Sequence, residues 1–273
     1  MTDWTVPPQL FIDRLARFGW LARGAVYLGI GVIAALAASG SGEATGSRGA
    51  LVTLLSQPFG RVLLAIVSLG LVAYAVWLGI QTFVGSDASE ARWQDLVVRA
   101  SRFVTALAHA MLALFGLRLL VEGRSLAEPG RTEAFAEMLM QQVGGRWWVT
   151  AVGVAILASA LAEFHWAGFK RFRERMDFGE DVAVFAVPIC QFGLAARGVV
   201  FAVVGVLFVL AGTQADPERA GGVSQALTVL HEQAYGRYLL GGVALGMIAF
   251  AGFSLFEARY RRVEIRKRDA SSG

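Results

Sequence analysis

The most constraining feature of this sequence is an apolar segment that occurs twice. Residues 18–38 read FGWLARGAVYLGIGVIAALAA and residues 192–212 read FGLAARGVVFAVVGVLFVLAG, so both copies open with FGxxARG and continue as an apolar run. Each copy is long enough to cross a bilayer core of about 30 Å as an α-helix, which takes roughly 20 apolar residues. The recurrence indicates tandem duplication of a membrane-spanning unit.

Apolar stretches of this length occur six times, separated by polar, glycine-rich or charged segments. Their approximate bounds are 18–38, 62–84, 102–120, 147–169, 192–212 and 237–256. Hydrophobic residues make up 56% of the chain and charged residues 17%, and the mean hydropathy is +0.55. Because a soluble domain of 273 residues needs a more polar composition, these values exclude a soluble protein.

The six spans form three units with one internal plan. In each unit, a span is followed by a shorter piece, a glycine–arginine pair and a second span. The shorter pieces are residues 49–57, 133–143 and 223–234. They are too short to cross a bilayer, so we expect them to be interfacial helices. Arg17 and Arg102 are 85 positions apart, as are Arg61 and Arg146, so the first two units keep register.

These patterns predict an all-α polytopic membrane protein with six transmembrane helices, arranged as three parallel two-helix repeats. The repeat units span about 14–84, 99–169 and 188–260 within a single transmembrane domain, residues 1–262. Residues 263–273 are expected to form a basic, disordered cytoplasmic tail. Because each unit has an even number of spans, successive units enter the membrane in the same sense and are related by an axis along its normal.

The placement of arginine and lysine predicts the orientation. Most of the 25 basic residues lie before the first span, in loops at 92–102 and 170–175, or after residue 259. Since cytoplasmic loops carry the excess of positive charge, both termini are predicted to be cytoplasmic. Ala35-Leu36-Ala37 after a basic start is also typical of a cleavable signal peptide. We reject that alternative because the pattern recurs at residue 192.

Four segments carry a resemblance to a known family. They are Phe18-Gly19, Ala22-Arg23-Gly24 with Tyr27, Pro58-Phe59-Gly60-Arg61, and Glu257-Ala258-Arg259-Tyr260-Arg261-Arg262. The chain resembles, from about residue 14 to 262, the bacterial membrane family called domain of unknown function 1206, described as a pair of transmembrane helices occurring three times. The middle unit departs from the pattern, with Ala108-His109 in place of Arg-Gly and Leu112 in place of the tyrosine. The resemblance implies the topology and, because the family is bacterial, a location in the inner membrane. It implies no activity, substrate or cofactor.

Arg23 and Arg197 lie about five residues inside their apolar runs, where a charge needs a partner, water or the interface. Either they extend to cytoplasmic headgroups, or they face the interior and bind Glu257 or Glu163, or an anionic ligand. Both glutamates fall at the cytoplasmic end of a second helix, and His109 lies towards the same face. These five residues form the candidate ligand or ion-pair site.

A metal site built from His109, Glu163 and His165 was also considered. The spacing is not diagnostic, and residues two apart on a helix do not share a face. We therefore predict no metal, and a hydrogen-bonded pair or a proton relay are the alternatives. Pro188 is expected to break an interfacial lead-in from the fifth span, and Gly242 and Gly246 to pack against a helix.

Three further arginines, each following a glycine, begin the second helix of each unit. A cation at a helix start opposes the helix dipole, so an anion must favour it. The candidates are lipid phosphate and the acidic residues Glu133, Glu137 and Glu232. Arg61, Arg146 and Arg237 are the predicted headgroup anchors.

The sequence contains no P-loop, nucleophile elbow, zinc-helix motif or CxxC pair. We therefore predict no enzyme, no catalytic residue and no cofactor. Arginines at helix ends also argue against nucleic-acid binding. The first hypothesis is a structural, lipid- or partner-binding membrane component, with membrane lipids, a protein partner or a second copy as partners. The alternatives are a small-solute or ion transporter or channel with a cavity on the pseudo-threefold axis and, more weakly, a haem or metal redox protein.

Overall fold

The structure, a computed structural model of the 273-residue chain, describes residues 9–84, 92–123 and 131–263. These residues form α-helices joined by short turns and contain no β-strand. The predicted all-α class is therefore confirmed. Apart from Val263, the predicted tail at 263–273 lies outside the described residues.

Six of the described helices are long and apolar enough to cross a membrane, as predicted. They are α1 (Gln9–Ala38), α3 (Gly60–Val84), α4 (Arg92–Glu122), α6 (Gly145–Phe169), α7 (Glu180–Gln214) and α9 (Gly236–Tyr260). A short helix follows the first long helix of each unit: α2 (Ser47–Leu55), α5 (Arg131–Met140) and α8 (Val223–His231). Two 3₁₀ turns, Arg171–Arg175 and Pro217–Arg219, complete the described elements.

The first helix of each unit begins well before its apolar run. α4 already includes residues 92–102, so the loop predicted there is wrong. α7 begins at Glu180 and continues through Pro188, which does not break the helix as predicted. Proline removes one backbone N–H donor. The neighbouring Val187 and Cys190 pack into a buried cluster with Phe172 and Phe253, which stabilises the continuous helix.

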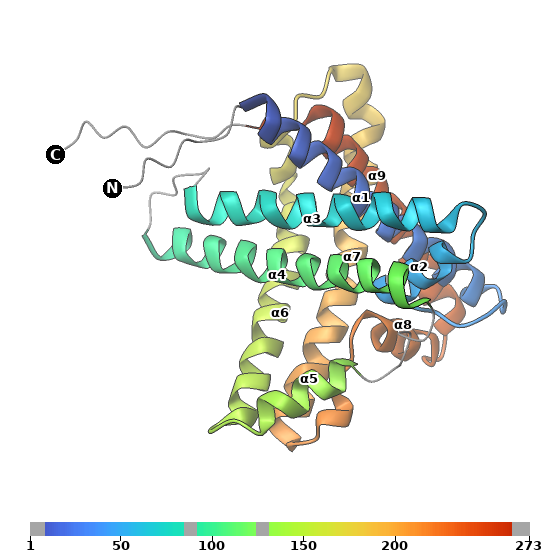
Figure 1. Ribbon diagram of the computed structural model, residues 1–273, viewed down its shortest axis with the longest axis vertical. Coiled ribbons are helices and arrows are strands. Elements are labelled where there is room, and N and C mark those ends of the chain that lie inside the picture. The colour runs from blue at the N-terminus through green and yellow to red at the C-terminus, as the bar shows by residue number, and fades with distance from the viewer. Residues whose placement is uncertain (1–8, 85–91, 124–130, 264–273) are drawn as a thin grey trace.

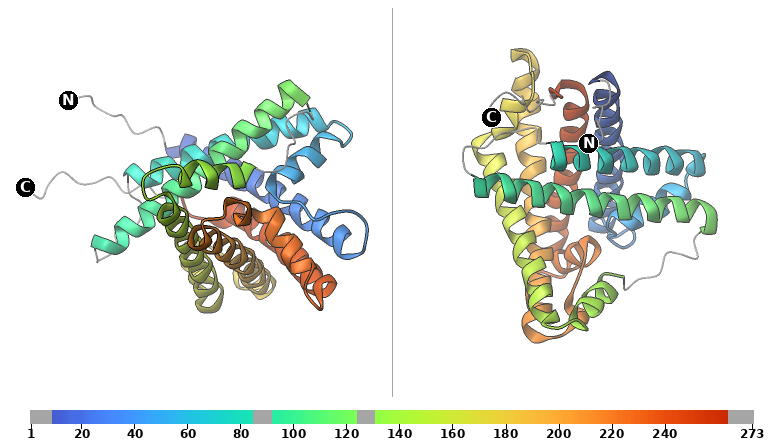
Figure 2. Two further views of the ribbon diagram at one scale, coloured as in Figure 1. Left: turned by 90° about the horizontal axis from the view of Figure 1, so that it is seen from below. Right: turned by 60° about the vertical axis from the view of Figure 1, so that its left-hand side comes forward.

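The long helices form an arc. α6, α7, α9 and α1 lie side by side, and the antiparallel pair of α3 and α4 crosses them at a steep angle (Figures 1 and 2). The first helix of each unit packs against the second helix of another unit, with α1 on α9, α4 on α3 and α7 on α6. The two helices of a unit also pack together in units one and three, as α1 on α3 and α7 on α9.

Unit two lacks this internal contact. In the described residues, α4 and α6 are not among the helix pairs that pack extensively. The order of packed neighbours is therefore α6–α7–α9–α1–α3–α4. The six long helices form an open arc whose two ends are α4 and α6. The largest apolar cluster fills the middle of the arc, with buried Val26, Ile30, Leu64, Val200 and Leu240 among its members.

Glycine allows the close packing inside units one and three. A Cβ added to Gly19 of α1 would lie 2.7 Å from the Cα of Tyr74 on α3, and one added to Gly193 of α7 would lie 2.7 Å from the Cα of Phe250 on α9. Neither position accepts a side chain without moving the backbone of the facing helix. The repeated approach shows that the two units use one packing mode.

Candidate functional site

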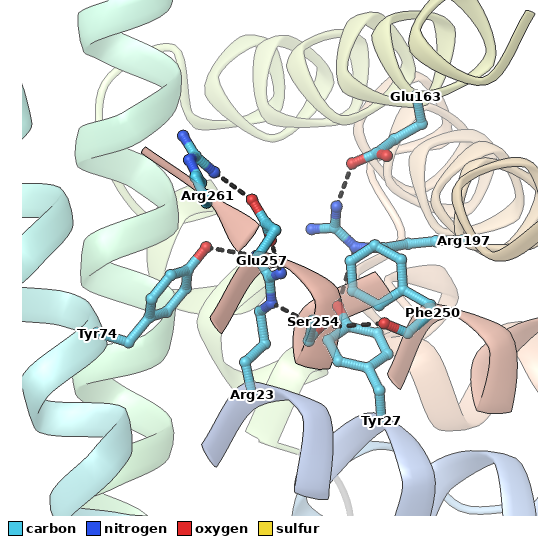
Figure 3. Close-up of polar contacts among 9 residues, drawn as sticks. All are labelled: Arg23, Tyr27, Tyr74, Glu163, Arg197, Phe250, Ser254, Glu257 and Arg261. Atoms are coloured by element: carbon cyan, nitrogen blue, oxygen red, sulfur yellow. Dashed lines mark hydrogen bonds and ion pairs between the residues drawn. The ribbon is translucent and has the colours of Figure 1, made fainter. Parts of the chain in front are cut away.

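Arg23 lies in the interior, with 7% of its surface exposed. Its guanidinium donates to the Ser254 hydroxyl at 3.1 Å, to the Tyr74 hydroxyl at 2.8 Å and to the Glu257 carboxylate (Figure 3). All three guanidinium nitrogens therefore have a partner, which offsets the cost of placing the charge inside the protein. Arg23 faces the bundle and does not extend to the headgroups.

Glu257, near the end of α9, is 2% exposed and binds two guanidinium groups. One oxygen accepts from Arg23 and the other from Arg261, one helical turn further along. The Arg261 guanidinium also lies over the Trp20 ring, with its Cζ 5.1 Å from the centroid. This one carboxylate therefore links the middle of α1 to the end of α9. Nearer the start of α1, Arg17 donates to the Ala258 carbonyl at 2.6 Å.

Arg197 of α7 has fewer partners than Arg23. Its Nε donates to the Tyr27 hydroxyl at 3.0 Å and its Nη1 to the Glu163 carboxylate on α6. The side chains of this pair are 14% and 15% exposed, against 8% and 3% for Arg23 and Glu257. The Phe250 ring lies near both guanidinium groups, 4.8 Å from the Cζ of Arg197 and 5.2 Å from that of Arg23.

Unit two supplies a neutral third contact. His109 of α4 meets Tyr74 of α3 edge to face, with ring centroids 4.8 Å apart, and its Nδ1 lies 2.8 Å from the Thr105 carbonyl oxygen. Because Tyr74 also accepts from Arg23, His109 is joined to the same cluster. The five predicted residues thus take part in two ion pairs and, with Tyr74, one ring contact. Each contact joins the first helix of one unit to the second helix of another. The helix pairs are α1 with α9, α7 with α6, and α4 with α3.

Tyr74, Ser254 and Arg261 also belong to this cluster and were missed from sequence. Tyr74 is a lone tyrosine in an apolar run and gives no signal. Arg261 could have been found, because it lies four residues after Glu257 on the same helix face. His165, in contrast, is exposed and packs on Phe169, with ring centroids 4.6 Å apart. Among the described residues, no three His, Cys, Asp or Glu side chains are placed to hold a metal ion.

The three headgroup arginines begin their helices through one repeated turn. The N–H groups of Gly60, Gly145 and Gly236 each donate at 2.8 Å to a glutamine carbonyl three residues earlier. All three arginine side chains are exposed, and in the part of the chain that the structure describes none pairs with Glu137 or Glu232. The side chain of Glu133 lies outside the described residues.

The cavity that the structure shows is not lined by the ion pairs. It has a volume of about 410 Å³ and lies between the end of α1, the end of α8 and the start of α9. Ser39, His231, Gln233, Tyr235 and Arg237 are among its lining residues, and Arg23, Arg197 and His109 are not. The transporter hypothesis expected a polar cavity at those last three residues.

The opening in unit two coincides with a difference in sequence from unit one. With the 85-residue offset, Val104 aligns with Gly19, and Leu107 aligns with Ala22, the residue that faces Gly70 of α3. Both residues are larger than their counterparts in unit one, and the side chain of Val104 lies outside the described residues. In the described residues, 22% and 17% of the most apolar windows of α4 and α6 are buried, against 44–50% in the other four spans. We call the α4 and α6 faces at this opening the open side.

Comparison with known proteins agrees with the three-unit plan. The chain matches the family described as Domain of Unknown Function (DUF1206) in three segments, residues 18–85, 100–170 and 192–261. An "Uncharacterized protein YxxB" of Bacillus subtilis (strain 168) is 26% identical over 261 residues, which cover 94% of each chain. No solved structure matches.

Proposed function

We propose that this protein, which belongs to the DUF1206 family, is a non-catalytic scaffold of the bacterial inner membrane that binds a partner transmembrane helix on its open side. The observation that carries the proposal is the missing contact between α4 and α6, which leaves these two spans the least buried of the six. Both chain ends are proposed to be cytoplasmic, and the contact of Arg17 with the end of α9 supports an even number of crossings.

The interior charges support a structural role. Each pair joins helices of different units, Arg23 with Glu257 across α1 and α9, and Arg197 with Glu163 across α7 and α6. A ligand that competed for either arginine would have to displace a carboxylate already in place. Breaking such a buried pair leaves an unpaired charge and is strongly destabilising. We therefore assign the pairs to holding the units together.

The open side of α6 favours a helix as the occupant. Its exposed residues include one stripe of alanines at intervals of four, three and four positions: Ala151, Ala155, Ala158 and Ala162. In membranes, small residues let helix backbones approach closely. Ala155 aligns with Gly70 of α3 and with Gly246 of α9, and a Cβ on either glycine would meet an alanine of the first helix of its own unit. The equivalent face of α6 has no such helix in the described residues.

The test is a matched pair of bulky substitutions. Ala155→Trp places a large ring on the open side, whereas Leu245→Trp places one on an exposed position of α9. We expect the wild-type protein and the Leu245→Trp variant, extracted from membranes under mild conditions, to migrate as a complex that Ala155→Trp dissociates. A wild-type protein that migrates alone with bound lipid would refute the partner-helix proposal.

A transporter is the second candidate, favoured by the greater exposure of the Arg197–Glu163 pair. If this pair opened and closed a path between units two and three, then Glu163→Gln would change ion flux into proteoliposomes. The scaffold proposal expects no flux above that of empty liposomes, for the wild type and the variant alike.

A further inference from the structure

We infer that the cavity between α1, α8 and α9 binds a phosphate group, carried by a lipid headgroup or by free phosphate, with Arg237 as its principal contact. This site is separate from the open side, and it stands or falls independently of the partner-helix proposal. The cavity volume of about 410 Å³ is within the range of ligand pockets, roughly 300–1,000 Å³.

The lining of the cavity is suited to an anion. Its charged group is the Arg237 guanidinium, and no aspartate or glutamate lines it. The Tyr235 and Tyr238 hydroxyls and His231 also line it. Ser39 and Gln233 line it too, but the Ser39 hydroxyl already donates to the Leu36 carbonyl and one Gln233 amide N–H to the Val229 carbonyl. Such donors commonly contact phosphate oxygens, and a negative charge at the start of α9 also compensates the helix dipole. The cavity therefore offers positive charge and hydrogen-bond donors without a competing carboxylate.

The Arg237 side chain is held in place by the protein itself. Its Nε donates to the Ala38 carbonyl at the end of α1, at 3.1 Å. In the described part of the chain, its two terminal nitrogens have no hydrogen-bond or ion-pair partner. A guanidinium presents its N–H groups as a planar fork that matches two oxygens of a phosphate. The bond to Ala38 fixes the side chain and leaves the outer part of the fork for a ligand.

Glycine at position 236 brings the parts of the site together. A Cβ there would collide with the carbonyl group of His231, so only glycine allows the end of α8 to lie against the start of α9. This contact places His231 beside Arg237 in the cavity wall.

The other two units lack this combination. The Arg146 guanidinium lies over the ring of Trp147, with its Cζ 4.9 Å from the centroid. Arg61 occupies the same turn and is exposed, but it does not line the cavity. Arg61 is also a predicted headgroup anchor, with the same charge and the same position in the repeat, but it lies outside the cavity. It is therefore a matched control that separates the cavity from headgroup contact at an exposed arginine.

The experiment measures thermal unfolding of the full chain in a phosphate-free, uncharged detergent. One series titrates inorganic phosphate and the other a short-chain phosphatidic acid, with chloride at equal ionic strength as the reference. The proteins are the wild type, Arg237→Gln, Arg237→Lys and the control Arg61→Gln.

We expect a ligand-dependent rise in melting temperature for the wild type and for Arg61→Gln. The apparent affinity should fall about tenfold or more in Arg237→Gln, the factor that corresponds to losing a charge-assisted hydrogen bond. It should fall less in Arg237→Lys, which retains the charge without the fork. A response to both ligands supports a site for phosphate itself, and a response to phosphatidic acid alone supports a lipid-headgroup site.

Two results would overturn the inference. One is the absence of any rise with either ligand in the wild type. The other is an equal loss of affinity in Arg237→Gln and Arg61→Gln, which would mean that the ligands respond to the overall positive charge. If Arg237→Gln does not fold, the test depends on Arg237→Lys. An affinity of Arg237→Lys equal to that of the wild type would exclude the fork contact and overturn the inference.

Discussion

The two ion pairs differ most in how many guanidinium groups each carboxylate binds, and Glu257→Gln tests this difference. Glu257 accepts from both Arg23 and Arg261, whereas Glu163 accepts from Arg197 alone among the described residues. A glutamine has one acceptor oxygen, and its NH₂ group is a donor. Glu257→Gln therefore leaves one guanidinium facing another donor, while the oxygen of Glu163→Gln can still accept from its single arginine.

The magnitudes follow from this geometry and from burial. Removing one partner of a buried ion pair costs about 3–5 kcal/mol. We expect Glu257→Gln to fall in that range, because both charges lie inside the bundle. For Glu163→Gln we expect about 1–3 kcal/mol, since the Arg197 guanidinium can still donate to the neutral amide oxygen and the pair is more exposed. The assay is reversible unfolding in mixed detergent and dodecyl sulfate micelles, monitored by tryptophan fluorescence.

A double variant tests whether the stability lost in Glu257→Gln comes from the second guanidinium. Arg261→Gln removes the second guanidinium that Glu257 must serve, so adding it to Glu257→Gln should recover part of the lost stability. The reasoning is refuted if Glu163→Gln costs as much as Glu257→Gln. It is also refuted if Arg261→Gln makes the Glu257→Gln variant still less stable.

Three further predictions concern packing and topology. Gly193→Val should destabilise the protein by about 1–3 kcal/mol or more, because its side chain would meet the backbone of Phe250. Gly242 faces open space and does not pack against a helix as predicted, so Gly242→Ala should leave the melting temperature unchanged or raise it slightly, since alanine favours the helix over glycine. The double variant Val104→Gly with Leu107→Ala should let α4 pack on α6. Protection of the α4 amides from hydrogen exchange would then rise. Unchanged protection would show that these two residues do not keep α4 apart from α6. Reporter fusions at the two chain ends should both give cytoplasmic signals, and signals from opposite faces would exclude six crossings.

Much of this architecture could be predicted from sequence because the physical signals are local. Apolar length alone indicates the six spans, and the recurring glycine–arginine pairs indicate the three units. The ends of the first helices could not be predicted in the same way. The residues before each apolar run continue the helix, so hydropathy does not mark where α4 or α7 begins.

The site was only partly predictable for a related reason. The depth of Arg23 and Arg197 in their spans indicates that each needs a partner, but both Glu163 and Glu257 lie at a suitable level. Which glutamate pairs with which arginine depends on the order of the helices around the arc. Tyr74 joins the cluster for the same reason, because α3 packs between α1 and α4.

The open side shows the opposite situation, because the sequence difference is visible but its structural setting is not. The middle unit visibly departs from the FGxxARG pattern, and Val104 replaces the glycine of the other units. This substitution matters only because the glycine faces the backbone of a neighbouring helix at van der Waals distance or less. The facing residue is known only from the structure.

The most direct test of the account measures oxygen accessibility at Ala155 by electron paramagnetic resonance. A spin label is attached to a cysteine at Ala155 or, as the lipid-facing reference, at Leu245, with the native buried Cys190 replaced by alanine. The protein is studied as one chain per lipid nanodisc. The account predicts equal accessibility of the two labels to oxygen dissolved in the bilayer. A label at Ala155 that is shielded as in a packed helix interface would contradict the open arrangement of α4 and α6.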